Sequence, residues 1–202
     1  MTVAIIQYNA GNTCSVRFAL ERLGVHTLIT DDILAIQSAD KVIFPGVGEA
    51  STAMEYLRNR GLDRIVKDLK QPVLGICLGM QLLCRHSEEN DTDCLGIFNT
   101  EVRLFSFDTI VPGGGSRLKV PQVGWNKITD GRLPLFTLAE SAPYFYFVHS
   151  YYAEICAQTA GVAEYGIPFS AALQKDNFYG VQFHPEKSAE SGEQLLINFL
   201  NV

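Results

Sequence analysis

The sequence predicts an α/β fold: a three-layer sandwich with a mixed, mostly parallel central sheet. In the first half, short apolar runs of strand length alternate with helical patterns, which is typical of βαβ units and of a parallel sheet covered on both faces. The second half contains several strand-like runs and a hairpin turn, which predicts antiparallel pairing as well. Because no repeat, low-complexity tract or linker interrupts the chain, we expect a single domain over residues 1–202.

Composition narrows the class of protein. The 202 residues are 47% hydrophobic and 19% charged, which is enough for a core that needs no disulfide or metal. A net charge of −6, with no run of Lys or Arg longer than a pair, argues against a nucleic acid or an anionic membrane as the main partner. Five irregularly spaced cysteines form no disulfide framework, and neither a signal peptide nor a membrane span is found, so we expect a cytoplasmic protein.

The first elements follow from hydrophobic spacing. Residues 3–8 are an apolar run that predicts a buried strand, closed by turn residues at 9–12. A helix follows, for which Thr13 or Ser15 can serve as the N-cap and Gly24 as the left-handed residue after the end. Its inner face would consist of apolar residues at helical spacing: Val16, Ala19, Leu20 and Leu23.

The same spacing predicts the remaining elements. In the first half we expect strands at 25–30, 41–44 and 72–77, and helices around 53–57 and at 78–86. In the second half we expect strand-like runs at 101–105, 144–155, 171–175 and 178–183, a connector at 112–116, and an amphipathic helix at 189–200. The Asp176-Asn177 pair predicts a hairpin turn between the last two of these strands.

The most informative segment is residues 75–81, which read Gly-Ile-Cys-Leu-Gly-Met-Gln. A strand meets a helix there, and glycines lie two residues before and after Cys77, as in a nucleophile elbow. The helix N-terminus favours a Cys77 thiolate, and the Leu78 amide would face a developing oxyanion. In the alternative interpretation, the glycines only permit close packing and Cys77 is a buried thiol.

A base and its orienting acid are available near the C-terminus. Residues 183–186 read Phe-His-Pro-Glu, and in extended chain the side chains of His184 and Glu186 would project from the same face. With Cys77 they would form a catalytic triad in which His184 moves the proton and Glu186 orients the ring. Taken alone, His184 is an ordinary loop histidine and Glu186 a solvated charge, and spacing does not show that His184 meets Cys77.

Together, residues 75–81 and 183–186 resemble the class I (triad) glutamine amidotransferases over nearly the whole chain, which implies a flavodoxin-like fold. The resemblance implies that Cys77 attacks the side-chain amide of glutamine, releases ammonia and leaves a thioester that water hydrolyses. Gln81 matches a position that holds the substrate, and residues 147–152 match a segment that lines the glutamine site through the backbone of His149, Ser150 and Tyr151.

Residues 45–48, Pro-Gly-Val-Gly, resemble the oxyanion strand of that family. The Val47 amide would be the second oxyanion donor beside Leu78, with Gly46 in the oxyanion hole and Gly48 at the substrate. Because glycines lower the cost of turning a peptide, we hypothesise that the hole is incomplete at rest and is completed when a partner signals.

Residues 119–126 resemble the signature of the glutaminase subunit of imidazole glycerol phosphate synthase, although Gln122-Val123 stand where that subunit more often has His-Met. Lys187 after the Glu186 position points the same way. The resemblance implies a heterodimer with a cyclase subunit of HisF type, an ammonia channel between them, and imidazole glycerol phosphate and aminoimidazole carboxamide ribotide as products in histidine biosynthesis. It also implies these partner contacts: Lys119, Pro121, Gln122, Trp125, Asn126 and Lys187.

Alternatives remain at this stage. The chain could serve another synthase, such as those that make anthranilate, guanylate or pyridoxal phosphate. It could also be a cysteine hydrolase on a similar fold, or a binding module that has lost its chemistry. Trp125 fits a core aromatic as well as an interface anchor. No cofactor is expected, and no metal, because Cys84, His86 and Cys94 lack the spacing of a metal site.

Overall fold

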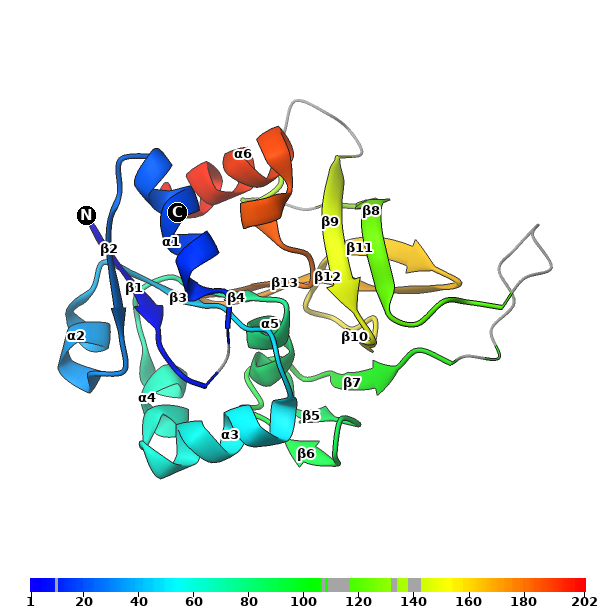
Figure 1. The fold of residues 1–202 in the computed structure, drawn as a ribbon, viewed down its shortest axis with the longest axis horizontal. Helices are drawn as coiled ribbons and strands as arrows, with labels where there is room; N and C mark the ends of the chain where they lie inside the picture. Colours follow the sequence, from blue (N-terminus) through cyan, green and yellow to red (C-terminus); the bar gives the residue numbers. More distant parts are fainter. Residues whose placement is uncertain (10, 107, 109–116, 132–133, 138–142) are drawn as a thin grey trace.

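A β-sheet between two layers of helices forms the centre of the protein (Figure 1). The computed structural model describes residues 1–9, 11–106, 108, 117–131, 134–137 and 143–202, so the connector predicted at 112–116 lies outside the described residues. The strand order is β2-β1-β3-β4-β13-β12-β10-β7-β5-β6, and β11 pairs with β12. The first five strands in this order are parallel: β2 (His26–Thr30), β1 (Thr2–Ile6), β3 (Lys41–Phe44), β4 (Val73–Ile76) and β13 (Phe178–Val181).

Side chains along each parallel strand point alternately to the two faces of the sheet, and helices cover both faces, which produces the three layers. Val3 and Ile5 of β1 pack with α1 (Thr13–Arg22) and α6 (Ala189–Leu200), whereas Ala4 and Ile6 pack on the opposite face. That face is covered by α2 (Ile33–Ser38), α3 (Ala50–Asn59), α4 (Leu62–Asp68) and α5 (Leu78–Leu83). Because successive side chains of a strand point to opposite faces, an almost wholly apolar strand is buried on both sides. The predicted three-layer α/β fold is confirmed.

The second half of the sheet is mixed, as predicted. The turn at Asp176, whose φ is 53°, joins β12 to the antiparallel β13. From β12 onwards, further strands extend the sheet. The bounds of these strands, in chain order, are β5 (His86–Ser87), β6 (Thr92–Asp93), β7 (Glu101–Leu104), β10 (Tyr151–Ala153), β11 (Thr159–Tyr165) and β12 (Ile167–Lys175).

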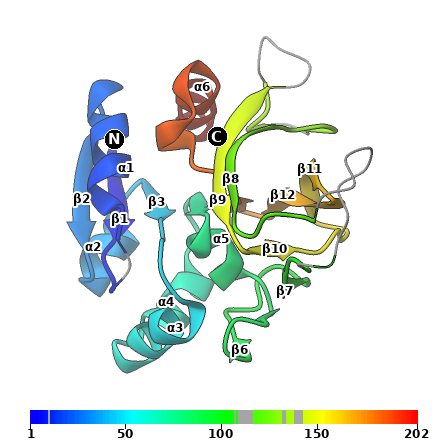
Figure 2. The ribbon, with the colours of Figure 1, turned by 45° about the vertical axis from the view of Figure 1, so that its right-hand side comes forward.

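A second, two-stranded sheet consists of β8 (Gln122–Lys127) and the antiparallel β9 (Tyr144–His149). The sequence predicts no strand at 122–127 and a continuous run at 144–155, but the chain leaves the small sheet at Ser150 and enters the main sheet as β10. Figure 2 shows this small sheet standing beside α6, with which β9 is in contact. The small sheet therefore lies over the middle of the main sheet instead of extending its edge.

Two predicted helix ends are wrong. The residue before α1 is Asn12, in a left-handed conformation, and not Thr13 or Ser15; Gly24 is left-handed as predicted. Helix α5 ends at Leu83 instead of continuing to His86, because the N–H groups of Ile97 and Phe98 both bond to the Leu83 carbonyl at 2.9 Å. A returning loop thus satisfies the Leu83 carbonyl, so another turn of helix is not needed to satisfy it.

The loops that follow β1, β3, β4 and β13 emerge at the same edge, because these strands are parallel. The strand order reverses direction between β1 and β3, and in open α/β sheets ligands bind beyond the carboxyl ends of the strands at such a point. This edge therefore carries residues 7–9, 11–12, 45–48, 77 and 182–187. Among the described residues, no helix is both long and apolar enough to cross a membrane.

Candidate active site

Cys77 lies in a strained turn between β4 and α5. Its φ of 53° and ψ of −112° are rare for a residue with a side chain, and the cost of such a conformation is typical of functional positions. Its backbone N–H donates to the Val181 carbonyl at 2.8 Å, which ties the turn to β13. A Cβ at Gly79 would overlap the Phe44 carbonyl, so both close packing and the elbow require glycine there. Packing alone does not explain the strained Cys77.

His184 and Glu186 are paired and buried. The His184 Nδ1 lies 2.8 Å from Glu186 Oε1, and both side chains are 0% exposed. The predicted pairing is right, but its route is not extended chain, because Pro185–Lys187 forms a 3₁₀ turn, η1, that brings Glu186 back to the ring. The backbone of His184 is also fixed, since its N–H donates to the Tyr146 carbonyl and its carbonyl accepts from Ser188 Oγ.

The charge state of His184 is set by opposing effects. Burial lowers its pKa, but the Cys77 sulfur and the Glu186 carboxylate raise it, and the net result is a pKa of about 10. The Cys77 sulfur lies close enough to raise the pKa of the ring, although Nε2 forms no aligned hydrogen bond among the described residues in this geometry. An imidazolium at neutral pH stabilises a facing thiolate. The structure thus brings together the three residues that the sequence suggests as a triad.

The oxyanion loop, residues 45–48, is in a closed arrangement. The Leu78 N–H, which the sequence suggests as an oxyanion donor, instead donates to the Gly46 carbonyl at 3.3 Å. The Gly46–Val47 peptide is trans, so its N–H points opposite to that carbonyl and away from the Leu78 amide. Gly46 therefore occupies the position where an oxyanion would be held. Turning this one peptide would remove the carbonyl and present the Val47 N–H.

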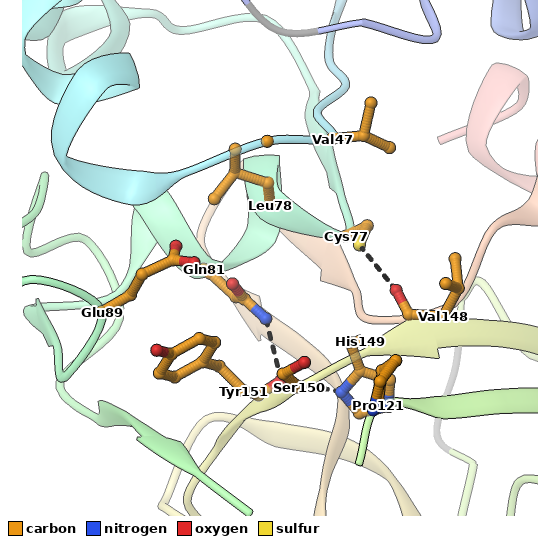
Figure 3. Close-up of a pocket in the computed structure, with 11 residues that line it drawn as sticks. Val47, Cys77, Leu78, Gln81, Glu89, Pro121, Val148, His149, Ser150 and Tyr151 are labelled. Atoms are coloured by element: carbon orange, nitrogen blue, oxygen red, sulfur yellow. Dashed lines mark hydrogen bonds between the residues drawn. The ribbon is translucent and has the colours of Figure 1, made fainter.

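A cavity of about 290 Å³ opens beside Cys77. Figure 3 shows the thiol directed to the Val148 carbonyl, at 3.8 Å, and Gln81 reaching towards residue 151. Every residue that the sequence assigns to substrate binding lines this cavity, as do both residues with expected oxyanion amides. The full lining is Val47, Gly48, Cys77, Leu78, Gln81, Glu89, Pro121, Val148, His149, Ser150 and Tyr151.

Gln81 and His149 are buried side chains that are held by hydrogen bonds at the cavity wall. Gln81 Nε2 donates to the Tyr151 carbonyl at 3.0 Å and to Gln182 Oε1 at 2.9 Å, so both of its N–H groups are used and its oxygen remains for a ligand. Burial lowers the pKa of His149 to about 4, so the ring is neutral at pH 7. The His149 ring lies between the Tyr151 carbonyl, at 2.7 Å, and the Gln122 side chain, at 2.9 Å.

The contact with His149 changes the interpretation of Gln122. The sequence places Gln122 among the partner contacts, but its side chain is 4% exposed and supports His149 from inside. The other candidate contacts differ from it: Lys119, Pro121 and Lys187 are exposed, Asn126 is half-buried, and Trp125 is 53% exposed. Trp125 is therefore no core aromatic, and its ring is free to meet another protein.

Two residues at the site have no signal in the sequence. Glu89 lines the cavity, its Oε2 accepts from the Ala50 N–H at 2.7 Å, and burial raises its pKa despite that bond. Gln182 donates to the Cys77 sulfur at 3.7 Å and is fully buried. Only its place directly before Phe183 and His184 could have suggested Gln182, whereas the fold alone brings Glu89 to the cavity. Among the described residues, no group of three His, Cys, Asp or Glu side chains could hold a metal ion.

Comparisons with known proteins identify the family and the fold. The model of the family "Glutamine amidotransferase class-I" matches residues 5–202. The fold resembles a GMP synthase subunit from Thermoplasma acidophilum, with a TM-score of 0.74 at 19% identity, covering 100% of this chain and 93% of that one. It also resembles a glutamine amidotransferase from Thermotoga maritima, with a TM-score of 0.66 at 13% identity, covering 100% and 83%. The chain belongs to the class I glutamine amidotransferases.

The relatives of higher identity narrow the type. "Imidazole glycerol phosphate synthase subunit HisH" of Bacteroides thetaiotaomicron is 54% identical over 202 residues, which is 100% of both chains. The subunit of the same name from Shewanella oneidensis is 45% identical over 214 aligned positions, covering 99% of this chain and 96% of that one. Within its family, the chain is of the HisH type.

Proposed function

We propose that this chain is the glutaminase subunit of an imidazole glycerol phosphate synthase. It would hydrolyse glutamine to glutamate and ammonia and pass the ammonia to a cyclase subunit. The observation that carries the chemistry is Cys77, held in a strained turn at the cavity wall with the buried His184–Glu186 pair beside it. Full-length identity of 54% to a HisH subunit supports the assignment to this synthase.

The cavity suggests how glutamine binds. The side-chain amide would lie at Cys77, and the α-ammonium group would meet the carboxylate of Glu89, the only acidic residue in the cavity lining of the described structure. The Gln81 oxygen and the backbone of Ser150 and Tyr151 would complete the contacts with the amino-acid end. Glutamine would replace water around Glu89, and the charge pair would offset the burial that raises the pKa of this carboxylate.

The reaction would proceed in two steps. The Cys77 thiolate attacks the amide carbon, and His184 gives its proton to the nitrogen as the C–N bond breaks, which releases ammonia and leaves a thioester. Neutral His184 then takes a proton from water, the hydroxide attacks the thioester, and glutamate leaves as Cys77 returns to its thiolate. Glu186 holds the ring in the orientation that both transfers need.

The closed oxyanion loop would keep the isolated chain slow. In each step the carbonyl oxygen of the substrate becomes an anion, and the Gly46 carbonyl stands against the Leu78 N–H that should receive it. When the Gly46–Val47 peptide turns, the Leu78 and Val47 amides would both face the oxyanion. We propose that docking of the loaded cyclase favours the turned state, so that ammonia is made only when it can be used.

The partner would be a cyclase subunit of HisF type in a cytoplasmic heterodimer, joined through the exposed Lys119, Pro121, Trp125 and Lys187. Free ammonia is protonated in water and then loses its nucleophilicity, so its transfer needs a sealed channel between the subunits. With this ammonia, the cyclase would form imidazole glycerol phosphate and aminoimidazole carboxamide ribotide.

Replacement of the nucleophile tests this function. The purified complex with Cys77→Ala should make no product from glutamine but should keep its synthesis from ammonium salts. Wild-type complex and Gln194→Ala, an exposed change on α6, are the controls. Loss of ammonia-dependent synthesis in Cys77→Ala would mean that Cys77 has a structural role, and glutamine-dependent synthesis by this variant would exclude Cys77 as the nucleophile.

A further inference from the structure

Asn12 makes an unusual contact at the end of β1. It is the residue before α1, a position where Asn usually caps the helix, yet its side chain makes no capping hydrogen bond. Instead Asn12 Nδ2 donates to Glu186 Oε1 at 2.5 Å, across 174 positions of sequence. Its left-handed backbone, with φ of 75° and ψ of 5°, turns the side chain out of the helix and towards the carboxylate.

Asn12 contacts the same Glu186 oxygen that orients the His184 ring. Glu186 Oε1 accepts from both His184 Nδ1 and Asn12 Nδ2, while Oε2 has no hydrogen-bond partner among the described residues. A buried glutamate side chain has three rotatable bonds, and with a single histidine partner its carboxylate would be free to turn. The second donor fixes the direction in which Oε1 points, and with it the plane of the imidazole ring.

We propose that Asn12 is a positioning residue of this enzyme: it holds the Glu186 carboxylate so that His184 faces Cys77. The proposal rests on the proposed glutaminase function. Asn12 does not line the cavity beside Cys77, so it acts through Glu186 and not on glutamine. Its loss should therefore lower kcat and leave the KM for glutamine nearly unchanged.

The first variant, Asn12→Gly, removes the amide and keeps the backbone. Glycine adopts a φ of 75° without strain, and no helix cap is lost because the side chain makes none. A hydrogen bond to a buried charge is strong enough that we expect kcat to fall about 10- to 100-fold, with KM within about twofold.

The second variant, Asn12→Asp, has the same shape but replaces the donor with a carboxyl group. Two carboxyl groups at this distance share a proton, so at low pH the introduced carboxyl group still donates to Glu186, whereas at high pH it is ionised and repels it. The other charged groups near Glu186 are His184, Cys77, the neighbouring Lys187, and Arg22 of α1 and Glu193 of α6, which line a cavity of about 100 Å³ beside it. These groups are present in wild type as well, so the effect of the new carboxyl group is measured as a ratio to wild type.

We would measure glutamate release by the complex of each variant with the cyclase subunit between pH 6 and pH 9. The ratio of kcat in Asn12→Asp to wild type should fall about tenfold over this range as one proton is lost. Asn9→Asp is the matched control, because it adds the same charge in the same loop on a side chain that contacts Thr52 instead of the triad. Its ratio should be independent of pH.

The outcomes separate the two proposals. The role of Asn12 would be overturned if Asn12→Gly had the kcat of wild type, or if the ratio of kcat in Asn12→Asp to wild type did not change with pH. In either case, turnover of glutamine by the wild-type complex would still support the glutaminase function. If wild type itself released no glutamate in the complex, the proposed function would fail first. Because Asn12→Gly is judged on kcat against KM, it decides the question even if Asn12→Asp does not fold.

Discussion

At the scale of single residues, the site depends on charges held out of water. His184 has a pKa of about 10 because the favourable interactions with Cys77 and Glu186 outweigh the cost of burial, whereas His149 has a pKa of about 4 because burial dominates. Of two buried histidines in one site, His184 is thus positively charged at neutral pH and His149 is neutral. His184 can hold a proton for transfer, and His149 is a neutral support for the chain at Tyr151.

Removal of the Cys77 sulfur should lower the pKa of His184. In Cys77→Ala the interaction of the ring with the sulfur is lost, and burial then opposes Glu186 alone. Titration of the imidazole by NMR should show a pKa clearly below that of wild type. The pKa of His184 in the folded protein lies above the ordinary 6.5. The contribution of His184 to the stability of the fold is therefore fully present below pH 6.5 and is lost as pH rises through 10. Over this range the free energy of unfolding should fall more steeply with pH for wild type than for the variant. An unchanged His184 pKa would contradict the proposed pairing.

His149 should make the protein sensitive to acid. Its pKa of about 4 in the folded protein lies below the ordinary 6.5. Above pH 6.5 the neutral ring costs the fold nothing, and as pH drops through 4 the free energy of unfolding falls by about 3 kcal/mol at most. Urea unfolding at pH 7 and pH 4.5 should show a smaller pH-dependent loss for His149→Gln than for wild type. His86→Gln, a change at a half-buried ring outside the cavity, is the comparison. Equal slopes in wild type and His149→Gln would show that His149 is not buried as described.

At the scale of elements, the oxyanion loop is anchored at its start. The buried Tyr8 hydroxyl at the end of β1 donates to the Pro45 carbonyl at 2.5 Å, and burial raises the pKa of Tyr8 well above 10, so it stays a donor. This bond fixes the Pro45–Gly46 peptide, and the next peptide is the one that would turn in the proposed activation. The fixed start allows the Gly46–Val47 peptide to change orientation without moving β3.

Tyr8→Phe should therefore destabilise the protein. It leaves the buried Pro45 carbonyl unpaired, and the expected loss in the free energy of unfolding is about 1–3 kcal/mol. Tyr144→Phe, which removes a hydroxyl from a side chain that is 53% exposed, should have an effect within about 0.5 kcal/mol. Urea denaturation of both variants checks this, and equal stability would mean that the bond does not anchor the loop.

The sequence predicts some elements and misses others for physical reasons. The parallel strands and the Cys77 elbow are local patterns of apolar residues and glycine, so they can be recognised. Extended chain predicts the His184–Glu186 pair, but the pair forms through a 3₁₀ turn, which Pro185 favours. Glu89 and Asn12 reach the site only through loops whose path depends on the tertiary fold, so no spacing indicates them.

At the scale of the whole molecule, the small β8–β9 sheet connects the exposed surface with the site. Trp125 on β8 lies opposite Tyr146 on β9, with ring centroids 6.1 Å apart, and the Tyr146 carbonyl accepts the His184 N–H. The neighbouring Val148 carbonyl faces the Cys77 thiol. A partner that docks on Trp125 would therefore press on the strand that contacts Cys77 and His184, two members of the proposed triad.

Trp125→Ala should weaken the complex. A half-exposed tryptophan at the centre of a contact is a common hot spot, and we expect the Kd for the cyclase subunit to rise at least about tenfold, with little change in the stability of the isolated chain. Leu34→Ala, on α2 at the other end of the sheet (Figure 1), is the control and should leave the Kd unchanged. Isothermal titration calorimetry measures both, and equal Kd values would move the interface elsewhere.

Glutamate release from the purified chain, first alone and then with the ligand-bound cyclase, shows whether this chain cleaves glutamine under the control of a partner. Because the Gly46 carbonyl lies against the Leu78 amide, we expect slow release by the chain alone and a rise of at least about 100-fold in the loaded complex, the size of effect expected for one oxyanion donor. Rapid release by the chain alone, unchanged by the cyclase, would contradict this expectation.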